Sequence, residues 1–246
     1  MTQNFFYPHL DNSYWKQCSS IKMRDKESKI ALMKLPALKI GTFLSRPNRF
    51  SSTIKYRDLV HSAHIHDPGR LTELLVKNAL VLFTDSKGKL TYYIKAVKKE
   101  DEWVIIDSSL HSKIALLLFK KLNDFKKVQK IDKEVNIGNS RIDFVLDGVP
   151  LEVKGVTLVE NDIALFPDAP TRRGTRHIQE IIDYEGMIMF LVFRKANSFK
   201  PNWNIDKDFS RKLSEARKKD VPIYVIQLSF NGEWIYYEGK IPLADF

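Results

Sequence analysis

Residues 141–154 constrain the fold more than any other stretch, because two alternating segments flank the dipeptide Asp147-Gly148. Alternation of polar and apolar residues indicates β-strands, and Asp-Gly is a favoured two-residue hairpin turn. A turn of this length fixes the register of the two strands, and that register places Asp143 opposite Glu152. The sequence therefore predicts a β-hairpin with two carboxylates facing each other.

Arg141 and Lys154 extend this charged face, because each lies two residues beyond a carboxylate on its own strand. Carboxylates directly opposite each other repel unless a cation bridges them, so Asp143 and Glu152 are candidate ligands of Mg²⁺ or Mn²⁺. A metal there would activate water for phosphodiester hydrolysis, and Lys154 would orient the water or stabilise the transition state. An ordinary hairpin with a charged solvent face is the alternative, and spacing alone leaves both open.

The charge balance favours a polyanionic partner. Forty basic and thirty acidic residues give a net charge of +10 and a pI near 9.5, which is typical of proteins that bind nucleic acids. Cys18 is the single cysteine, which excludes an intrachain disulfide and a cysteine-rich zinc site. No apolar run approaches the roughly 20 residues that span a bilayer, and we expect a cytoplasmic protein without a membrane partner.

The sequence divides into three parts that differ in pattern. Residues 1–32 are polar and lack clear periodicity, so we expect a loosely ordered extension or a start codon placed too early. Residues 33–107 contain short β-rich runs separated by turns, which predicts a small OB-like β-barrel. Residues 108–246 begin with a helix capped by Ser108 or Ser109. They continue as hairpin, helix, strand, helix and strand, which predicts a mixed sheet flanked by helices and an α+β or α/β fold class.

Basic and aromatic residues gather in two places that suit nucleic acid. Small barrels bind single strands through such side chains, although aromatic residues in a barrel core and solvated bases are equally consistent with the sequence. The segment 171–177 carries arginines and a histidine at a helix start, where cations are unfavourable unless an anion binds. The alternative is that these charged side chains lie on the surface by chance and bind no partner. The candidate nucleic-acid contacts are Arg46, Arg49, Phe50, Arg70, Arg141, Arg172, Arg173, Arg176 and His177.

Several motifs together resemble the sugar fermentation stimulation protein A family. They are Arg46-Pro47-Asn48-Arg49-Phe50, Pro68-Gly69-Arg70-Leu71, Ser140-Arg141-Ile142-Asp143-Phe144, Leu151-Glu152-Val153-Lys154, Phe166-Pro167-Asp168-Ala169, Thr171 with Arg173-Gly174 and His177, and Phe199-Lys200-Pro201-Asn202. The resemblance covers about residue 33 to the C-terminus.

The resemblance implies an N-terminal OB-like domain followed by a domain similar to the PD-(D/E)xK nucleases. It places Asp143, Glu152 and Lys154 on the metal and catalytic positions, and Glu134 on an upstream acidic position that would supply a third metal ligand. A solvated charge at a strand end is the alternative for Glu134. Two residues depart from the family pattern: Arg172 stands where an acid is usual, and Asp67 stands where many members have Asn.

Two functions from different classes follow. The first is a DNA-binding protein with Mg²⁺-dependent nuclease activity, which would be a homodimer if it cuts both strands. The second is a non-catalytic DNA-binding regulator of maltose metabolism on a nuclease-like scaffold, since the family is described as DNA-binding with such a proposed role. The sequence does not distinguish DNA from RNA, or single-stranded from duplex and structured DNA.

Overall fold

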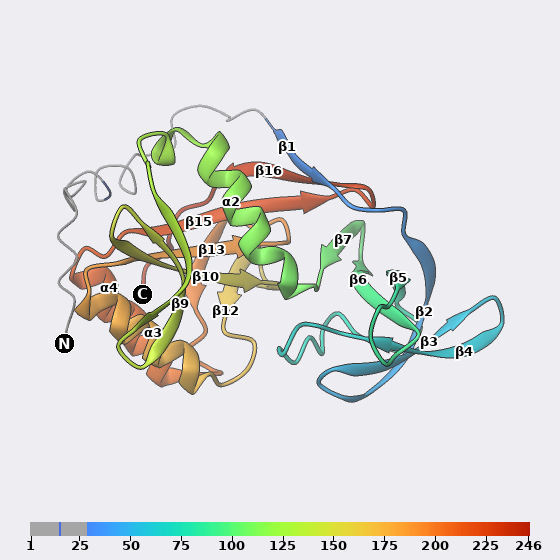
Figure 1. Cartoon of the computed structure of the whole chain (residues 1–246). Coiled ribbons are helices and arrows are strands. Elements are labelled where there is room, and N and C mark those ends of the chain that lie inside the picture. The colour runs from blue at the N-terminus through green and yellow to red at the C-terminus, as the bar shows by residue number, and fades with distance from the viewer. Residues whose placement is uncertain (1–14, 16–28) are drawn as a thin grey trace.

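The computed structural model describes Trp15 and residues 29–246, which form a small barrel joined to a larger sheet domain (Figure 1). The barrel strands follow one another in the order β4-β3-β2-β5-β6-β7, and parallel pairing of β4 with β6 closes a five-stranded ring. This confirms the predicted OB-like barrel. Its strands are β2 (Lys39–Asn48), β3 (Ser51–Tyr56), β4 (Leu59–His64), β5 (Leu80–Asp85) and β6 (Tyr92–Lys99), with β7 (Glu102–Ile105) paired outside β6.

The second domain is built on a seven-stranded mixed sheet, as predicted. Its order is β1-β16-β15-β13-β10-β9-β8, with parallel pairing of β10, β13 and β15 and antiparallel pairing elsewhere. Its strands are β1 (Ile30–Lys34), β8 (Ile131–Ile137), β9 (Ser140–Leu146), β10 (Val149–Val156), β13 (Met187–Val192), β15 (Ile223–Phe230) and β16 (Trp234–Lys240).

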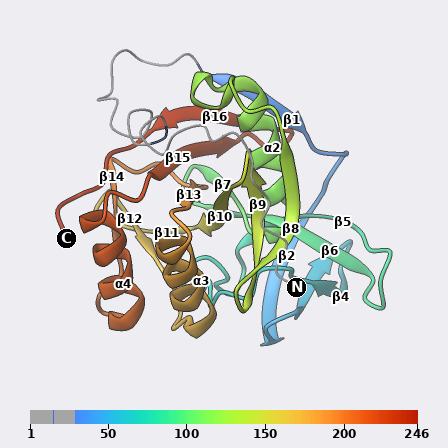
Figure 2. The same cartoon turned by 60° about the vertical axis from the view of Figure 1, so that its left-hand side comes forward.

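Helices cover both faces of this sheet (Figure 2). On β13, the side chains of Met187, Met189 and Leu191 join the core under α2 (His111–Lys121), and those between them join the core under α3 (Arg172–Asp183) and α4 (Lys207–Lys218). The near-continuous apolar sequence of β13 follows from this burial on both faces.

The caps of these helices agree only in part with the sequence. Thr171 caps α3, as predicted. Before α2, however, Asp107 accepts a hydrogen bond from the Ser109 backbone N–H and caps the short 3-10 helix η1 (Ser108–Leu110). α2 itself begins after Leu110 without a side-chain cap, so the predicted serine cap is wrong, because η1 precedes α2 and takes its cap from Asp107.

A three-stranded sheet connects the large sheet to α3. It consists of β11 (Leu158–Glu160), β12 (Ile163–Phe166) and β14 (Ser198–Pro201). The peptide bond between Phe166 and Pro167 is cis, and the chain then passes Asp168 before α3 begins.

The domain boundary lies a few residues away from the expected one. Strand β1 pairs with β16 of the large sheet, so residues 30–34 belong to the second domain, and the chain crosses into the barrel before Lys39. The five residues of β1 lie at the edge of the sheet. Their alternation of polar and apolar residues is too weak for the strand to be recognised from the sequence. Trp15 is buried with its ring 5.8 Å from that of Phe125, beside the 3-10 helix η2 (Asn123–Phe125). The rest of the predicted extension up to residue 28 lies outside the described residues.

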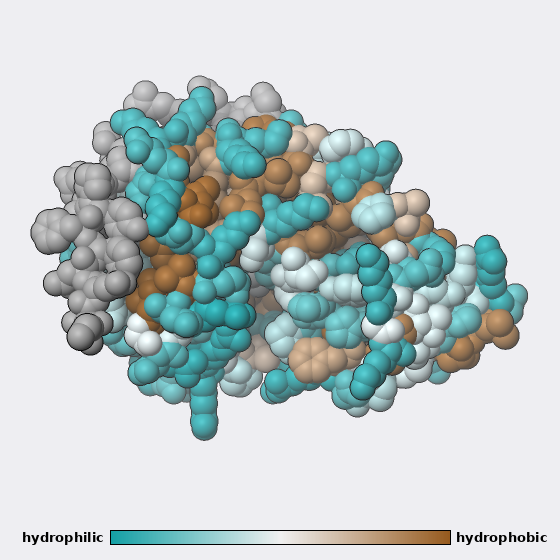
Figure 3. All heavy atoms as spheres, in the orientation of Figure 1, coloured by the Kyte–Doolittle hydropathy of each residue, from teal (hydrophilic) through white to brown (hydrophobic). Residues whose placement is uncertain are grey.

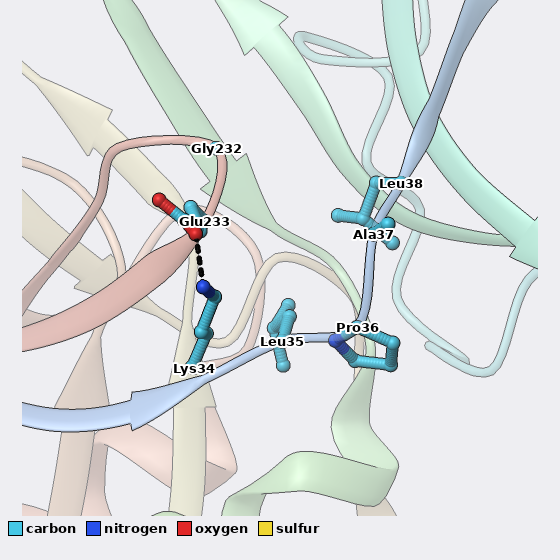
Figure 4. A pocket seen from close by; sticks show the side chains of 7 residues that line it. All are labelled: Lys34, Leu35, Pro36, Ala37, Leu38, Gly232 and Glu233. Carbon is cyan, nitrogen blue, oxygen red and sulfur yellow. Dashed lines mark ion pairs between the residues drawn. The ribbon is translucent and has the colours of Figure 1, made fainter.

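Figure 4 shows a pocket beside this crossing. Its lining comes from residues 34–38 and 232–233, and an ion pair joins Lys34 to Glu233. None of the predicted site residues lines it, so the pocket belongs to the joint between the domains. Among the described residues, no helix is both long and apolar enough to cross a membrane.

Candidate active site

The β9–β10 hairpin has the predicted register around its turn. Phe144 pairs with Leu151, and Asp147 and Gly148 take the positive φ angles of 48° and 91° that a two-residue hairpin turn requires. The backbone ladder ends at this pair. Instead of the expected ladder pair with Glu152, the Asp143 carboxylate accepts a hydrogen bond from the Val153 backbone N–H at 2.8 Å.

The end of the ladder also changes which core Ile142 joins. Strand alternation would place Ile142 and Phe144 on one face, but Phe144 packs under α2 and Ile142 packs under α3. Once β9 leaves the ladder, its alternation is no longer held in phase by β10. The two strands therefore separate where the carboxylates lie, and the Asp143 side chain spans the opening.

Glu152 lies at the centre of a chain of polar contacts. Its carboxylate is ion-paired with Lys154 on the same face of β10 and accepts a hydrogen bond from His177 Nδ1 of α3 at 2.5 Å. Arg173 Nε donates to the other ring nitrogen, His177 Nε2, at 3.1 Å. These contacts place the imidazole proton on Nδ1. The side chains of Glu152 and His177 are only 3% and 2% exposed, so these contacts replace water.

The remaining oxygen of Glu152 indicates what the site would hold. Oε2 is buried and has no hydrogen-bond partner among the described residues, and such an atom is costly unless a ligand satisfies it. No group of three or more acidic, histidine or cysteine ligands occurs in the described part of the chain. Mg²⁺ is usually held by one or two carboxylates together with water and substrate phosphates. Asp143 and Glu152 fit that donor set.

The two carboxyl groups have opposite acid–base properties. Burial, reinforced by the charge of Glu152, raises the pKa of Asp143 to about 6. Burial also opposes ionisation of Glu152, but the Lys154 charge and the hydrogen bond from His177 outweigh it and lower the pKa of Glu152. Groups whose pKa values are driven apart in this way are typical of catalytic sites.

Glu134, the predicted third ligand, lies at the exposed edge of the site on β8. Its carboxylate forms an ion pair with Arg141 Nε at 2.8 Å, and its backbone has a φ of 54°, an unusual value for a residue within a strand. Its charge makes the smallest contribution to the raised pKa of Asp143. Metal binding by Glu134 stays a prediction, as does a nucleic-acid contact by Arg141.

The arginines at the start of α3 remain accessible. Arg172, Arg173 and Arg176 are exposed, and Figure 3 shows hydrophilic side chains gathered over this part of the molecule. Arg176 also donates to Ser140 Oγ of β9 at 3.1 Å. His177 differs from these arginines, because its buried ring faces Glu152. The sequence did not predict the contact between His177 and Glu152. The only signal for it was that His177 follows Arg173 by four residues.

The barrel candidates differ in a similar way. The two terminal nitrogens of Arg46 donate to four backbone carbonyls at 2.7–2.8 Å, so this guanidinium holds two loops together. Arg49 and Arg70 provide two of those carbonyls and are themselves exposed, and the Phe50 side chain is 53% exposed. Binding of nucleic acid by these four residues stays a prediction.

The loop held by Arg46 also contacts the second domain. Asp168, from the loop before α3, accepts a hydrogen bond from the Leu71 backbone N–H at 3.2 Å. Asp67 accepts one from the Gly69 N–H at 2.8 Å, and a side chain at Gly69 would collide with both carboxylates. Burial, and to a lesser degree the charge of Asp168, raises the pKa of Asp67 to about 6. The sequence did not predict this contact of Asp67 and Asp168 between the two domains.

Gly155, the residue after Lys154, was also missed. A Cβ atom there would lie 2.1 Å from the ring of His111, the first residue of α2, so only glycine lets this ring lie against β10. The ring of His111 also stacks on Phe193, with the ring centres 5.4 Å apart. The start of α2 therefore packs on the face of β10 opposite to the one that carries Glu152 and Lys154.

Comparison with known proteins supports this two-domain arrangement. The sequence profile of the SfsA N-terminal OB domain matches residues 44–106, and that of the Sugar fermentation stimulation protein RE domain matches residues 109–234. A sugar fermentation stimulation protein homolog from Thermosipho melanesiensis is 38% identical over 86% of this chain and 97% of its own length. One from Methanosphaera stadtmanae is 39% identical over 78% of this chain and 88% of its own length.

A solved structure, that of Pyrococcus furiosus SfsA in complex with Ca²⁺, has the same fold. It superposes with a TM-score of 0.81 at 27% sequence identity, covering 88% of this chain and all of the other. Since both domain profiles and full-length relatives agree, the chain belongs to the sugar fermentation stimulation protein family.

Proposed function

We propose that this protein is a divalent-metal-dependent nuclease that hydrolyses phosphodiester bonds of DNA at Asp143, Glu152 and Lys154. One observation carries the proposal: the buried Glu152 carboxylate has an oxygen without a partner among the described residues, next to the carboxyl group of Asp143. A hard cation with open positions for water and phosphate is the ligand that best suits such a pair. The Pyrococcus furiosus relative, solved with Ca²⁺, supports a hard cation in this family.

The residues around the pair have separate tasks. Asp143 and Glu152 would hold Mg²⁺ or Mn²⁺, which when bound supplies an activated water and offsets charge on the phosphate. Lys154, held against Glu152 and 16% exposed, is placed to donate to a phosphate oxygen or to the attacking water. His177 keeps Glu152 ionised and oriented through its Nδ1–H, and Arg173 fixes the tautomer of His177.

The positive charge of the protein supports DNA as the substrate. The exposed arginines at the N-terminus of α3 lie on the element that also provides His177, and a helix N-terminus attracts phosphate through its dipole. The net charge of +10 adds a long-range attraction that weakens as salt rises. These features direct the backbone of a nucleic acid toward the carboxylates.

The proposal is tested by cleavage of labelled single-stranded, duplex and branched DNA with Mg²⁺ or Mn²⁺. Glu152→Gln keeps the size of the side chain and removes its charge, so cleavage should fall at least about 100-fold. The matched control is Glu160→Gln, which makes the same change on an exposed residue of β11 and should leave cleavage unaltered.

Binding of Mg²⁺ to the same two variants, followed by calorimetry, gives a readout independent of turnover. Loss of the binding heat in Glu152→Gln alone would support the site. Salt-sensitive DNA binding without cleavage, equal in both variants, would overturn the nuclease and leave a non-catalytic DNA-binding regulator on the same scaffold.

A further inference from the structure

Four aromatic rings form a row on one end of the barrel. The ring of Phe50 stacks on His64 with centres 6.5 Å apart and 20° between the ring planes. His64 contacts His66 at 5.6 Å and Tyr93 at 5.1 Å, and His66 stacks on Tyr93 at 6.2 Å and 26°. Pairing of β4 with β6 holds His64 beside Tyr93. His64 and Tyr93 therefore belong to the barrel closure, whereas Phe50 lies in the turn before β3 and His66 follows β4.

The row differs from a second ring cluster in the same barrel, because two of its four members are exposed. Phe50 and His66 are exposed, and His64 and Tyr93 are partly exposed. In the second cluster, Tyr56 and Tyr92 pack around Phe83, which is fully buried. That cluster is accounted for by the barrel core. None of the rings in the row that begins at Phe50 is buried, so packing in the barrel core does not account for this row.

The row ends where the barrel meets the start of the second domain. The backbone carbonyl of His66 accepts a hydrogen bond from Ser108 Oγ at 2.7 Å, three residues before His111. His111 is not part of the exposed row, because its ring stacks on Phe193. As described above, its ring lies against Gly155, next to Lys154. Because Gly155 and Lys154 face opposite sides of β10, the row of rings ends at the start of the second domain.

We propose that this row (Phe50, His64, His66 and Tyr93) stacks the bases of a single DNA strand and presents its backbone to the second domain. The inference rests on the proposed function and specifies its substrate as DNA with a single-stranded segment. Bases of any sequence stack on aromatic rings, and the faces of duplex bases are not available for this. Arg49, exposed beside Phe50, would contact the phosphates.

Binding to the full chain without divalent cation tests the row separately from cleavage. The probe is a fluorescein-labelled oligothymidylate of about 20 nucleotides, measured by anisotropy at fixed salt, and stacking of one base predicts a loss of about 5- to 150-fold in Phe50→Ala. Phe50→Trp should restore affinity. Leu59→Ala is the matched control, because Leu59 is also an exposed apolar residue but lies at the opposite end of the same β3–β4 hairpin. It should change affinity less than twofold.

An abasic strand of equal length separates stacking from charge. The wild-type protein should bind it more weakly, and the difference between wild type and Phe50→Ala should disappear. Equal losses in Phe50→Ala and Leu59→Ala, or a Phe50→Ala loss that persists on the abasic strand, would overturn the row. Cleavage that survives Glu152→Gln would overturn the proposed nuclease but not the row, so the two failures are distinguishable.

Discussion

Two pairs of acidic residues in this protein differ in what surrounds them. Asp143 pairs with Glu152 inside the sheet domain, and Asp67 pairs with Asp168 across the joint between the domains. In both pairs, burial raises the pKa of the first residue to about 6, and the charge of the second contributes. A raised pKa therefore does not separate a site from a structural contact.

The groups that surround each pair of acidic residues distinguish one pair from the other. Asp67 and Asp168 each accept a hydrogen bond from a backbone N–H within one short loop, as expected of carboxylates that hold a fold together. Glu152 instead receives Lys154 and His177, which lower its pKa, and its second oxygen has no partner among the described residues. Opposite pKa shifts together with an unsatisfied oxygen support the proposal that Asp143 and Glu152, and not the loop pair, form the site.

The largest expected effect comes from making the same substitution in both pairs. Asp143→Asn should reduce DNA cleavage at least about 100-fold, because a neutral amide is a poor ligand for a hard cation. Asp67→Asn should change the rate less than threefold. Initial rates under saturating Mg²⁺ measure both, and equal losses in the two variants would show that the two pairs are not functionally different.

A smaller effect is expected from pH. Because Mg²⁺ binds the ionised carboxylate and the pKa of Asp143 is about 6, metal affinity should fall about tenfold for each pH unit below 6. Calorimetric titration at pH 7, 6 and 5 measures this. Asp67→Asn is the control and should show the same pH dependence, since Asp67 titrates in the same range but lies outside the metal pair. An affinity independent of pH would contradict the assignment of Asp143.

His177 is expected to act as a positioning residue with an effect of about tenfold. His177→Ala removes the hydrogen bond to Glu152, which raises the pKa of that carboxyl group, so the acidic limb of the rate–pH profile should move to higher pH. His177→Asn can still donate a hydrogen bond and should restore part of the rate. A lower rate with an unchanged profile would indicate that His177 only supports packing.

The smallest effect concerns stability. The folded-state pKa of Asp67, about 6, lies above the usual 3.8, so the stability from the neutral form is present below pH 3.8 and lost as pH rises through 6. Asp67→Asn never ionises and keeps an oxygen for the Gly69 N–H. It should raise the free energy of unfolding by about 1–2 kcal/mol at pH 7 and leave it unchanged near pH 3.5.

Urea unfolding at the two pH values measures this change. Asp168→Asn should show a smaller increase at pH 7, because it removes only the charge that acts on Asp67. A loss of stability at pH 7 in Asp67→Asn would mean that the ionised carboxylate strengthens the joint. That result would contradict the expectation that the charge of buried Asp67 destabilises the fold at neutral pH.

Several parts of this fold could be predicted because their determinants are local. The hairpin turn at Asp147-Gly148, the cap at Thr171 and the buried strand β13 each depend on a few neighbouring residues. The barrel was predicted from short alternating runs, and pairing of β4 with β6 confirms its closure. Strand β1 was missed, because its membership of the large sheet depends on β16 at the other end of the chain.

The sequence by itself determined the register of the hairpin, and with it that Asp143, Glu152 and Lys154 come from adjacent strands. A two-residue turn allows one pairing, and a shift by one residue would expose the apolar face. Only the tertiary structure decided that the ladder opens at Asp143, that His177 meets Glu152, and that Asp67 lies beside Asp168. These contacts join side chains from separate elements, and the packing of α3 and of the barrel loop against the sheet domain determines where they meet.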